Sequence, residues 1–457
     1  MPASPSPANG ADLPIAIVGA GFSGTLLAIN LLRLGARVVL VERDREKLAR
    51  GLAFGTRAPE HLLNVRAANM SAFPDDPGHF LRWMGFSSQE QANRFAPRLT
   101  YGQYLREQLL AALAAAPGRF AIREEEALGI DWHADHAALR LASGQVIAAR
   151  AVVLALGNFA PARLPVLAGL APPVLIDNPW SAAVTQDLEG IDHVLLVGTG
   201  LTAVDVALSL EKAGYRGRIT ALSRRGLAPR AHAAEGPVVG AVPRPEARGS
   251  WLLRQLRRRA GHVGWRHAVD ELRAHTQSLW RQHDAAAQAR FLRHLRPWWD
   301  VHRHRLAPPV AEVIDRLRAD GRLDFVAGRL LGAEPRGDGA HVRWQPRGGG
   351  PERQLDVGRV VLCTGPEGDI TRSDHPLLRA LVAEGRARAD VHRLGLDVDH
   401  TGSVLDAQGR RQPHLYAVGP VTKGEAWEII AVPDIRRQVW HLARMLSNTH
   451  WIGGEGL

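Results

Sequence analysis

The stretch that decides the fold lies near the N-terminus, where residues 15–24 read IAIVGAGFSG. The apolar run predicts a short buried strand, and the glycine pattern after it is typical of a turn into a helix. Gly19 allows the tight turn, Gly21 lets the backbone approach a pyrophosphate, and Gly24 permits close packing of helix on strand. Because the pattern stands between a strand and a helix, it favours a dinucleotide-binding turn over an ordinary glycine-rich loop.

The residues around this turn indicate which dinucleotide it binds. Phosphates are expected at the helix N-terminus, beside Phe22 and Ser23, because free N–H groups and the helix dipole attract anions there. A second strand over 37–41 ends at Glu42, with Arg43 as a further candidate contact. The Glu42 carboxylate can bridge the ribose hydroxyls of adenosine and would repel a 2′-phosphate. The first site is therefore predicted to take FAD or NAD.

The same pattern restarts in the middle of the chain. A strand over 194–197 runs into residues 198–203, which read GTGLTA and contain the candidate contacts Gly198, Gly200, Leu201 and Thr202. Alanine in the third glycine position is a permitted variant of the motif. The sequence therefore predicts a second dinucleotide-binding turn.

The second strand of this repeat, over 218–222, ends in Ser223, Arg224 and Arg225 instead of an acid. The planar fork of arginine suits a phosphate monoester, and the serine hydroxyl adds a donor. This ending predicts NADPH as the second cofactor. The alternative is that both arginines are ordinary surface residues of an arginine-rich chain.

Late apolar strands close both repeats, one over 151–156 before Gly157 and one over 360–362 before Cys363 and Gly365. The order of elements predicts an α/β fold with two Rossmann-like dinucleotide-binding domains, one inserted into the other. The expected parts are a disordered leader over 1–13, an FAD-binding domain over 14–175 and 366–457, and an NAD(P)H-binding domain over 176–365 that contains a helical insert over 246–320.

The composition excludes several classes of protein. Cys363 is the only cysteine among 457 residues, so an intrachain disulfide and a redox-active cysteine pair are both excluded. No apolar run approaches the ~20 residues of a membrane span, and the first residues lack the features of a signal peptide. We therefore expect a cytoplasmic protein without a membrane partner.

The charge and the histidines favour simple interpretations. The net charge of +11 comes almost entirely from arginine, and no nucleic-acid-binding motif accompanies it, so a nucleic-acid partner is not expected. His294, His302 and His304 lack other ligands at useful spacing, so no metal is expected. The tryptophan- and arginine-rich helices of the insert are interpreted as core-packing elements with a solvated face, or alternatively as a substrate-covering lid.

The C-terminal part contains further candidates for the flavin site. A helix is predicted from about Pro433, and its N-terminus would stabilise an anionic reduced flavin if it faces the isoalloxazine; otherwise it only packs. Gly419 and Trp427 are candidate flavin contacts. Asn64 and Glu428, both in loops, are the candidate catalytic residues beside the flavin.

Together these motifs resemble the YdhS-like bacterial family of FAD/NAD(P)-binding proteins. The resembling segments are 19–24, 61–65, 70–74, 97–98, 101–105, 198–202 with Asp205, 223–227 and 424–436. More distantly, the chain is similar to flavin-dependent N-hydroxylating and Baeyer–Villiger-type monooxygenases, which carry a segment like Arg98, Tyr101 and Tyr104. Related two-domain reductases have Gly-Asp where this chain has Gly419-Pro420. That aspartate holds the ribityl chain, so another group must substitute here.

The resemblance and the missing redox thiols leave two kinds of acceptor for the electrons from NADPH. In the favoured one, reduced FAD reacts with oxygen to a C4a-hydroperoxide that hydroxylates a small amine-type substrate inside a water-excluding pocket. In the alternative, the electrons pass to a quinone or an electron carrier. A non-catalytic dinucleotide-bound sensor is the third possibility. The expected partners are thus a small molecule and molecular oxygen, with the substrate and oligomeric state left open.

Overall fold

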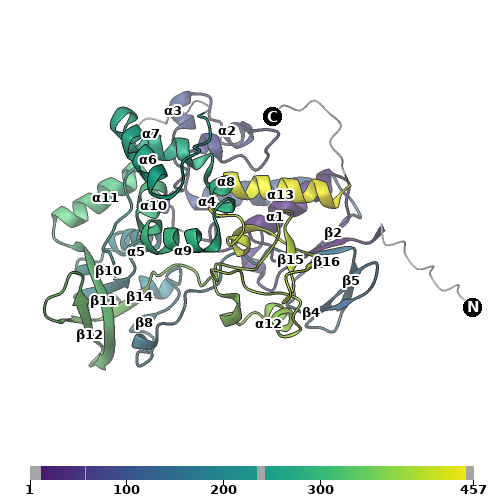
Figure 1. Cartoon of the computed structure of the whole chain (residues 1–457). Coiled ribbons are helices and arrows are strands. Elements are labelled where there is room, and N and C mark those ends of the chain that lie inside the picture. Colours follow the sequence, from purple (N-terminus) through teal and green to yellow (C-terminus); the bar gives the residue numbers. More distant parts are fainter. Residues whose placement is uncertain (1–11, 57, 234–241, 449–457) are drawn as a thin grey trace, which may run out of the picture. The chain divides into compact units, whose positions relative to one another are not determined.

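A computed structural model of the chain describes residues 12–56, 58–233 and 242–448. The chain divides into two compact units (Figure 1). Unit 1 comprises Met1–Arg57, Val65–Phe159 and Gly368–Leu457, and unit 2 comprises Ala58–Asn64 and Ala160–Glu367. Each unit has its own parallel sheet, so the predicted α/β fold with two Rossmann-like units is confirmed. Nearly all of the expected leader lies outside the described residues.

The expected domain boundary at residue 176 is displaced, because the chain passes into unit 2 already at Ala160. Leu167 and Leu170 are buried in the core of unit 2 together with Leu195 and Val360. Burying these apolar side chains against that sheet stabilises the segment there. Residues 58–64, expected in the first domain, also belong to unit 2.

The sheet of unit 1 is centred on the strand that the opening motif predicts. Strand β1 (Ile15–Val18) pairs in parallel with β2 (Val38–Val41) on one side and β7 (Ala151–Leu154) on the other. All residues of β1 are buried, as expected for a continuous apolar run inside a parallel sheet. The order β15-β16-β7-β1-β2-β3 is completed by β3 (Phe120–Arg123), β16 (Arg411–Ala417) and the antiparallel β15 (Ser403–Leu405).

Helix α1 (Phe22–Arg33) is buried along nearly its whole length. It contacts β1, α4 (Arg98–Ala114) and α13 (Val432–Leu446). A small antiparallel sheet and further helices complete unit 1: β4 (Ala127–Trp132), β5 (Ala137–Leu141), β6 (Val146–Ala149), α2 (His79–Trp83), α3 (Gln89–Ala92), α12 (Pro376–Ala383) and the 3₁₀ helices η2 (Arg45–Lys47), η3 (Ala67–Asn69), η6 (Ile370–Arg372) and η7 (Gly419–Thr422).

The sheet of unit 2 has the order β13-β12-β11-β10-β9-β14-β8. Strand β9 (His193–Val197) pairs in parallel with β10 (Arg218–Ser223) and β14 (Arg359–Leu362). The long strand β11 (Leu323–Arg336) first pairs in parallel with β10 and then in antiparallel with β12 (Gly339–Pro346). The two edges are β8 (Leu175–Ile176) and β13 (Arg353–Val357). The second repeat therefore forms a sheet of its own.

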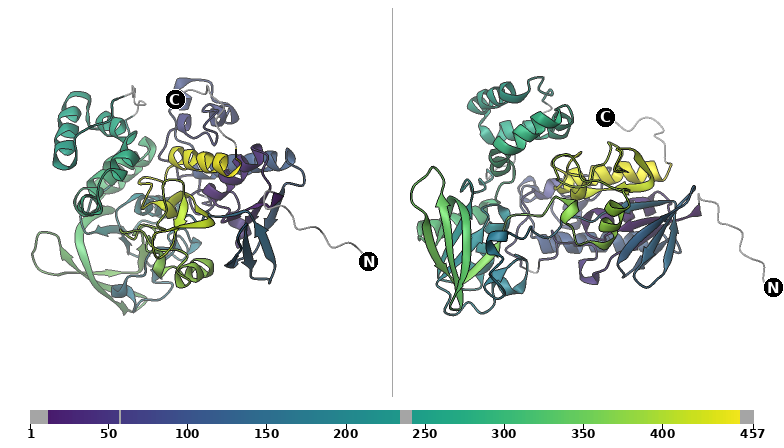
Figure 2. Two further views of the ribbon diagram at one scale, coloured as in Figure 1. Left: turned by 45° about the vertical axis from the view of Figure 1, so that its right-hand side comes forward. Right: turned by 60° about the horizontal axis from the view of Figure 1, so that its bottom comes forward.

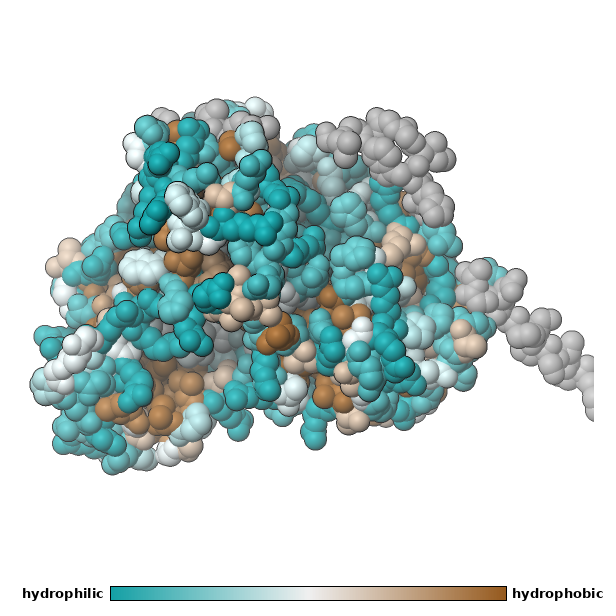
Figure 3. Space-filling view, viewed as in Figure 1, coloured by the Kyte–Doolittle hydropathy of each residue, from teal (hydrophilic) through white to brown (hydrophobic). Residues whose placement is uncertain are grey.

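The helical insert predicted over 246–320 is confirmed, since these residues form helices and no strand. Figures 1 and 2 show α6–α10 as a helical layer apart from the strands of unit 2. Hydrophilic side chains cover most of the insert surface that Figure 3 shows. The helices of unit 2 are α5 (Leu201–Lys212), α6 (Gly249–Val263), α7 (Trp265–Arg273), α8 (Thr276–Arg281), α9 (Ala285–His294), α10 (Arg296–Arg303) and α11 (Pro308–Ala319), with the 3₁₀ helices η4 (Pro165–Leu167) and η5 (Ala182–Val184). Among the described residues, no helix is long and apolar enough to cross a membrane.

Candidate cofactor sites

The glycine-rich turn of unit 1 is enforced by its own packing. Gly19 has a φ of +99°, and a Cβ there would lie 2.5 Å from the carbonyl oxygen of Ala155, at the end of β7. A Cβ at Gly24 would lie 1.8 Å from the carbonyl oxygen of Gly19. Both positions therefore require glycine for the strand, turn and helix to pack together.

The end of β2 braces this turn. Glu42 Oε2 accepts a hydrogen bond of 2.8 Å from the backbone N–H of Ala20, and Oε1 accepts one of 3.1 Å from Asp44. Each carboxylate oxygen has a further lone pair, so Glu42 keeps acceptor capacity for ribose hydroxyls. Arg43 is exposed and forms a surface ion pair of 2.8 Å with Glu126. The contact of Arg43 with the dinucleotide stays a prediction.

The start of α1 is formed by Gly21, Phe22 and Ser23. Gly21 is the N-cap residue, and no described side chain caps the helix. A Cβ at Gly21 would meet the Cα of Gly51 at 3.4 Å, so this glycine also packs against the loop that follows β2. The buried ring of Phe22 lies 5.5 Å from that of Phe54, which fills the space behind the turn. Free N–H groups at such a helix start attract phosphate.

The turn after β16, where related reductases have a Gly-Asp pair, is held by side-chain hydrogen bonds. Gly419 has a φ of +78°, and a Cβ there would lie 2.3 Å from the hydroxyl oxygen of Ser23. Its N–H donates to Gln438 Oε1 over 2.7 Å, while Gln438 Nε2 donates to the Thr422 hydroxyl over 2.9 Å. The Thr422 hydroxyl donates to the Gly419 carbonyl over 2.8 Å. Gln438, which the sequence analysis missed, thus connects α13 to this turn.

Helix α13 begins at Val432 with Pro433 in its first turn, close to the predicted start. Arg436, one turn further on, donates from Nη1 to the Ser71 carbonyl over 2.8 Å, and burial lowers the pKa of its guanidinium. Burial also raises the pKa of Tyr104 to about 12, and its hydroxyl oxygen accepts a hydrogen bond from the N–H of Ala72. The tyrosines of the segment that resembles monooxygenases are therefore buried packing residues here.

The turn of unit 2 repeats the geometry of the first. Gly198 has a φ of +130°, and a Cβ there would lie 2.2 Å from the carbonyl oxygen of Cys363. Gly200 precedes α5, which begins with Leu201 and Thr202, and no described atom lies within 4 Å of a Cβ built at Gly200. This space beside a helix N-terminus is what a pyrophosphate needs.

The last strand of each repeat ends beside a similar glycine. Gly157 and Gly365 have φ values of +68° and +83°, and no described atom lies within 4 Å of a Cβ built on either. Cys363 itself is buried, and desolvation followed by the charge of Asp205 raises the pKa of its thiol. A thiol held neutral in this way is a poor nucleophile.

The structure corrects the expected role of Ser223. Its hydroxyl lies 2.9 Å from that of Thr199 and accepts a hydrogen bond of 3.0 Å from the N–H of Gly226. The Thr199 hydroxyl donates to the Leu227 carbonyl over 2.7 Å, so the Ser223 hydroxyl donates to Thr199. Ser223 therefore closes the turn after β10 and is not the free phosphate donor that we expected.

The two arginines after β10 differ in their surroundings. Arg224 is exposed, and its guanidinium has no partner among the described residues. Arg225 donates from Nη2 to the Arg293 carbonyl over 3.0 Å. A third arginine, Arg347, donates from Nη1 to the backbone carbonyl of Arg224 over 3.3 Å. Arg347 was not among the predicted contacts because no local motif in the sequence marks it.

The candidate catalytic residues belong to different units. Asn64 lies in unit 2, where its backbone carbonyl is 3.1 Å from His232 Nε2. Glu428 lies in unit 1, is 3% exposed and has a φ of +69°. Left-handed backbone at a non-glycine residue costs of order 1–3 kcal/mol and clusters at functional sites. Trp427, its neighbour, is buried with Lys423 Nζ 5.1 Å from the ring centre.

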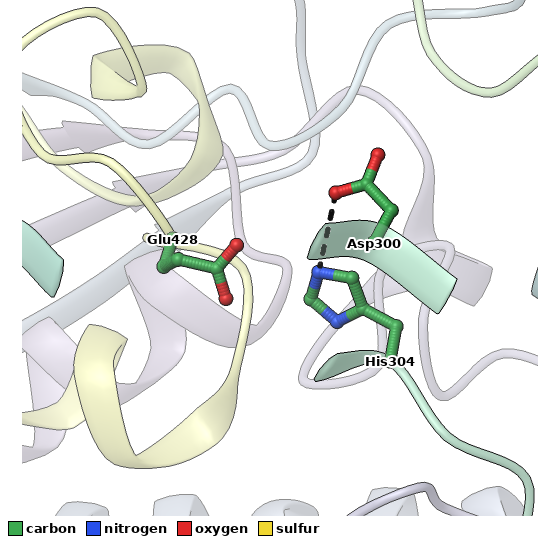
Figure 4. Close-up of side chains that lie close together, drawn as sticks. All are labelled: Asp300, His304 and Glu428. Atoms are coloured by element: carbon green, nitrogen blue, oxygen red, sulfur yellow. Dashed lines mark ion pairs between the residues drawn. The ribbon is translucent and has the colours of Figure 1, made fainter. Parts of the chain in front are cut away.

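His302 and His304 each have a partner on α10. His304, the C-cap residue of α10, has its Nε2 4.0 Å from Asp300 Oδ1, the pair that the dashed line marks in Figure 4. This is the ordinary spacing of residues one helical turn apart. His302 Nδ1 lies 2.7 Å from the Trp298 carbonyl, and His294 ends α9. Glu428, also labelled in Figure 4, is a residue of unit 1.

Comparison with known proteins supports the cofactor interpretation of the first repeat. Residues 16–159 match a family model described as FAD-NAD(P)-binding. No curated protein matches the chain. The matched region, which includes β1, α1 and Glu42, is therefore an FAD/NAD(P)-binding domain.

Solved structures share the fold of the whole chain. L-lysine 6-monooxygenase from Pseudomonas syringae has 16% identity and a TM-score of 0.67, covering 95% of this chain and 99% of that one. The ornithine N-hydroxylase of Kutzneria sp. 744, solved with reduced FAD, NADP⁺ and L-ornithine, has the same identity and coverage and a TM-score of 0.65. Thioredoxin reductase from T. acidophilum has 13% identity and a TM-score of 0.55, covering 96% and 98%. The two-unit fold is thus that of monooxygenases and disulfide reductases alike.

Proposed function

We propose that this chain is an FAD-dependent, NADPH-using monooxygenase that hydroxylates a small amine-type substrate. The observation that carries the proposal is the presence of two glycine-rich turns on separate sheets, followed by an acid in one unit and by arginines in the other. Glu42 suits an unphosphorylated adenosine, whereas Arg224 suits a 2′-phosphate. One chain then holds both an electron donor and a flavin.

The residues of unit 1 fit FAD. The uncapped start of α1 would hold the pyrophosphate, and Glu42 would hold the ribose. The open space beside Gly157 and the turn at Gly419, which Gln438 supports, would border the rest of the flavin. Bound FAD, once reduced, supplies the activation of molecular oxygen. The protein's part is to bind, to orient and to exclude water.

The residues of unit 2 fit NADPH. The start of α5 beside Gly200 would hold the pyrophosphate, and the exposed Arg224 after β10 would hold the 2′-phosphate. This arrangement, with the segments noted above, also supports membership in the YdhS-like family. We propose Trp427 and Glu428 as further residues of the flavin site and Asn64 as a polar residue beside the substrate.

The chemistry of Cys363 favours oxygen over a disulfide as the electron acceptor. A disulfide reductase of this fold needs a thiol pair, and this chain has a single, buried cysteine whose pKa is raised. The lysine and ornithine hydroxylases that share the fold act on amines, which supports an amine-type substrate. An NADPH:quinone or NADPH:carrier reductase remains the second candidate because it needs no thiol.

Oxygen consumption tests the proposal. The FAD-loaded protein is mixed with NADPH in air and with a panel of amino acids and diamines, while NADPH oxidation, oxygen uptake and hydrogen peroxide release are followed. We expect oxygen uptake to match NADPH use, and the true substrate to suppress peroxide release because it captures the activated oxygen. Rapid anaerobic NADPH oxidation with a quinone, without a hydroxylated product from any amine in air, would establish the reductase instead.

A further inference from the structure

The turn after β10 lies directly against the neighbouring strand. In the parallel pairing of β10 with β11, Ser223 faces Ala327. A Cβ built at Gly226 would lie 2.7 Å from the backbone N of Ala327. The turn that carries Arg224 and Arg225 is therefore held against the middle of the long strand β11.

A distant segment reaches the same place. Arg347 follows β12, and its backbone N–H donates to the Ala327 carbonyl over 2.9 Å. Its side chain extends to Arg224, whose backbone carbonyl accepts a hydrogen bond of 3.3 Å from Arg347 Nη1. The backbone bond sets where Arg347 leaves the sheet, and the side-chain bond sets where its guanidinium lies. The Arg347 guanidinium thus lies against the backbone of Arg224, and both arginines are exposed.

Arg225 faces a different neighbour. Its Nη2 donates to the backbone carbonyl of Arg293, in the last turn of α9. Carbonyl groups at a helix C-terminus are left without helical partners and favour a cation. Arg225 therefore connects the turn after β10 to the helical insert.

We propose that Arg347 and Arg224 together bind the 2′-phosphate of NADPH, while Arg225 anchors the turn to α9. This inference rests on the proposed function, in which unit 2 binds the nicotinamide cofactor. A phosphate monoester carries close to two negative charges at neutral pH, which two guanidinium groups balance. Arg347 uses one N–H on Arg224 and keeps the others for phosphate oxygens.

The test compares the binding of NADP⁺ and NAD⁺ to the FAD-loaded protein by isothermal titration calorimetry. R347A and R224A are each expected to weaken NADP⁺ binding by about 10- to 150-fold, since a charged hydrogen-bonded contact to the phosphate is lost. Both should leave NAD⁺ binding unchanged. R347K should be intermediate, because lysine keeps the charge without the planar fork.

Two further variants act as controls. R343A removes an arginine of β12 that pairs with Glu352 over 3.2 Å, and it should leave both affinities unchanged. R225A should lower the melting temperature while changing the NADP⁺-to-NAD⁺ affinity ratio less than R347A does. A smaller change of the NADP⁺-to-NAD⁺ affinity ratio in R225A than in R347A therefore assigns anchoring to Arg225 and phosphate binding to Arg347.

The failures are distinguishable. If the unaltered protein binds NADP⁺ no better than NAD⁺, the NADPH assignment of the proposed function is wrong. If it prefers NADP⁺ but R347A keeps that preference, the role of Arg347 is wrong and the proposed function stands. A loss of affinity for both nucleotides alike would show that Arg347 only shapes the turn, which also overturns the inference.

Discussion

At the scale of single residues, both repeats place a glycine where a backbone carbonyl leaves no room for a side chain. The first glycine of each turn faces a backbone carbonyl at the end of the last parallel strand of its repeat, Ala155 for Gly19 and Cys363 for Gly198. A side chain at either position would separate that strand from the turn. The third positions differ, because Gly24 has no room for a Cβ whereas Ala203 supplies one. The turn of unit 2 is therefore the more open of the two.

Gly21 provides a residue-level test of the flavin site. G21V places two methyl groups at the start of α1, against Gly51 and in the expected path of the pyrophosphate. We expect purified G21V to contain little or no FAD, measured as flavin released per protein. G261A, at an exposed glycine of α6 with no described atom within 4 Å of its Cβ, should load FAD normally. Full flavin occupancy in G21V would contradict the assignment.

Cys363 provides a test of the electron path. C363S replaces a buried thiol with a hydroxyl, which costs about 1–3 kcal/mol of stability if the hydroxyl finds no partner. The melting temperature should therefore fall, whereas kcat for NADPH oxidation should stay essentially unchanged. A large loss of kcat in protein that remains folded and loaded with FAD would revive thiol chemistry.

Glu428 and Asn64 are tested through the coupling of NADPH oxidation to substrate hydroxylation, which falls when hydrogen peroxide is released instead. E428A and N64A are each expected to release more hydrogen peroxide per NADPH oxidised in the presence of substrate, because each residue is proposed to supply a polar contact to the flavin or to the substrate. FAD occupancy should remain at the level of the unaltered protein. E384A, at an exposed position of unit 1, is the control and should stay coupled. Unchanged coupling in both variants would remove these residues from the site.

At the scale of elements, Gln438 connects α13 to the turn at η7, where related reductases have a Gly-Asp pair. Gln438 holds the buried N–H of Gly419 and the hydroxyl of Thr422 at once. The positive φ of Gly419 keeps its Cα next to Ser23 at the start of α1. Gln438 thereby joins α13 to η7, and the turn at Gly419 lies against the start of α1.

Q438A tests this connection. The variant leaves the buried Gly419 N–H without its acceptor, which costs about 1–3 kcal/mol of stability. We expect a lower melting temperature, measured in a calorimetric scan. We also expect weaker FAD binding, measured by titrating the apoprotein with FAD. Q438E, which keeps an acceptor, should be milder, and Q408A, at an exposed residue of the same unit, should have no effect. If Q438A binds FAD as tightly as the unaltered protein, the turn does not support the flavin.

At the scale of the whole molecule, each unit has its own sheet, core and glycine-rich turn. A ligand that binds only the folded state raises the melting temperature by mass action. FAD and NADP⁺ are therefore each expected to raise the melting temperature of the apoprotein in a calorimetric scan. A protein that responds to neither nucleotide would not be a dinucleotide-binding enzyme.

The manner of flavin attachment is also a property of the whole molecule. Cys363 is buried at the end of β14 in unit 2, and the flavin is assigned to unit 1. We expect FAD to be held without a covalent bond, so denaturation and filtration should release all of the flavin. Flavin that stays with the precipitated chain would contradict this expectation.

The sequence by itself determined the elements that local sterics and burial dictate. Strand β1, helix α1 and the glycines between them were predictable, because a continuous apolar run must be buried and a turn with positive φ needs glycine. The second repeat was predictable for the same reasons, and the helical insert was predictable from its helical periodicity. The matching family region over 16–159 begins at this motif.

Only the tertiary structure decided the features that depend on contacts between distant segments. Residues 160–175 belong to unit 2 because their leucines fill its core, and Ser223 is engaged because Thr199 and Gly226 surround its hydroxyl. Gln438 contacts Gly419 and Arg347 contacts Arg224, each from an element distant in sequence, and no local sequence pattern predicts either contact. A glycine turn is a property of neighbouring residues, whereas a hydrogen bond across the sheet exists only once both segments have packed.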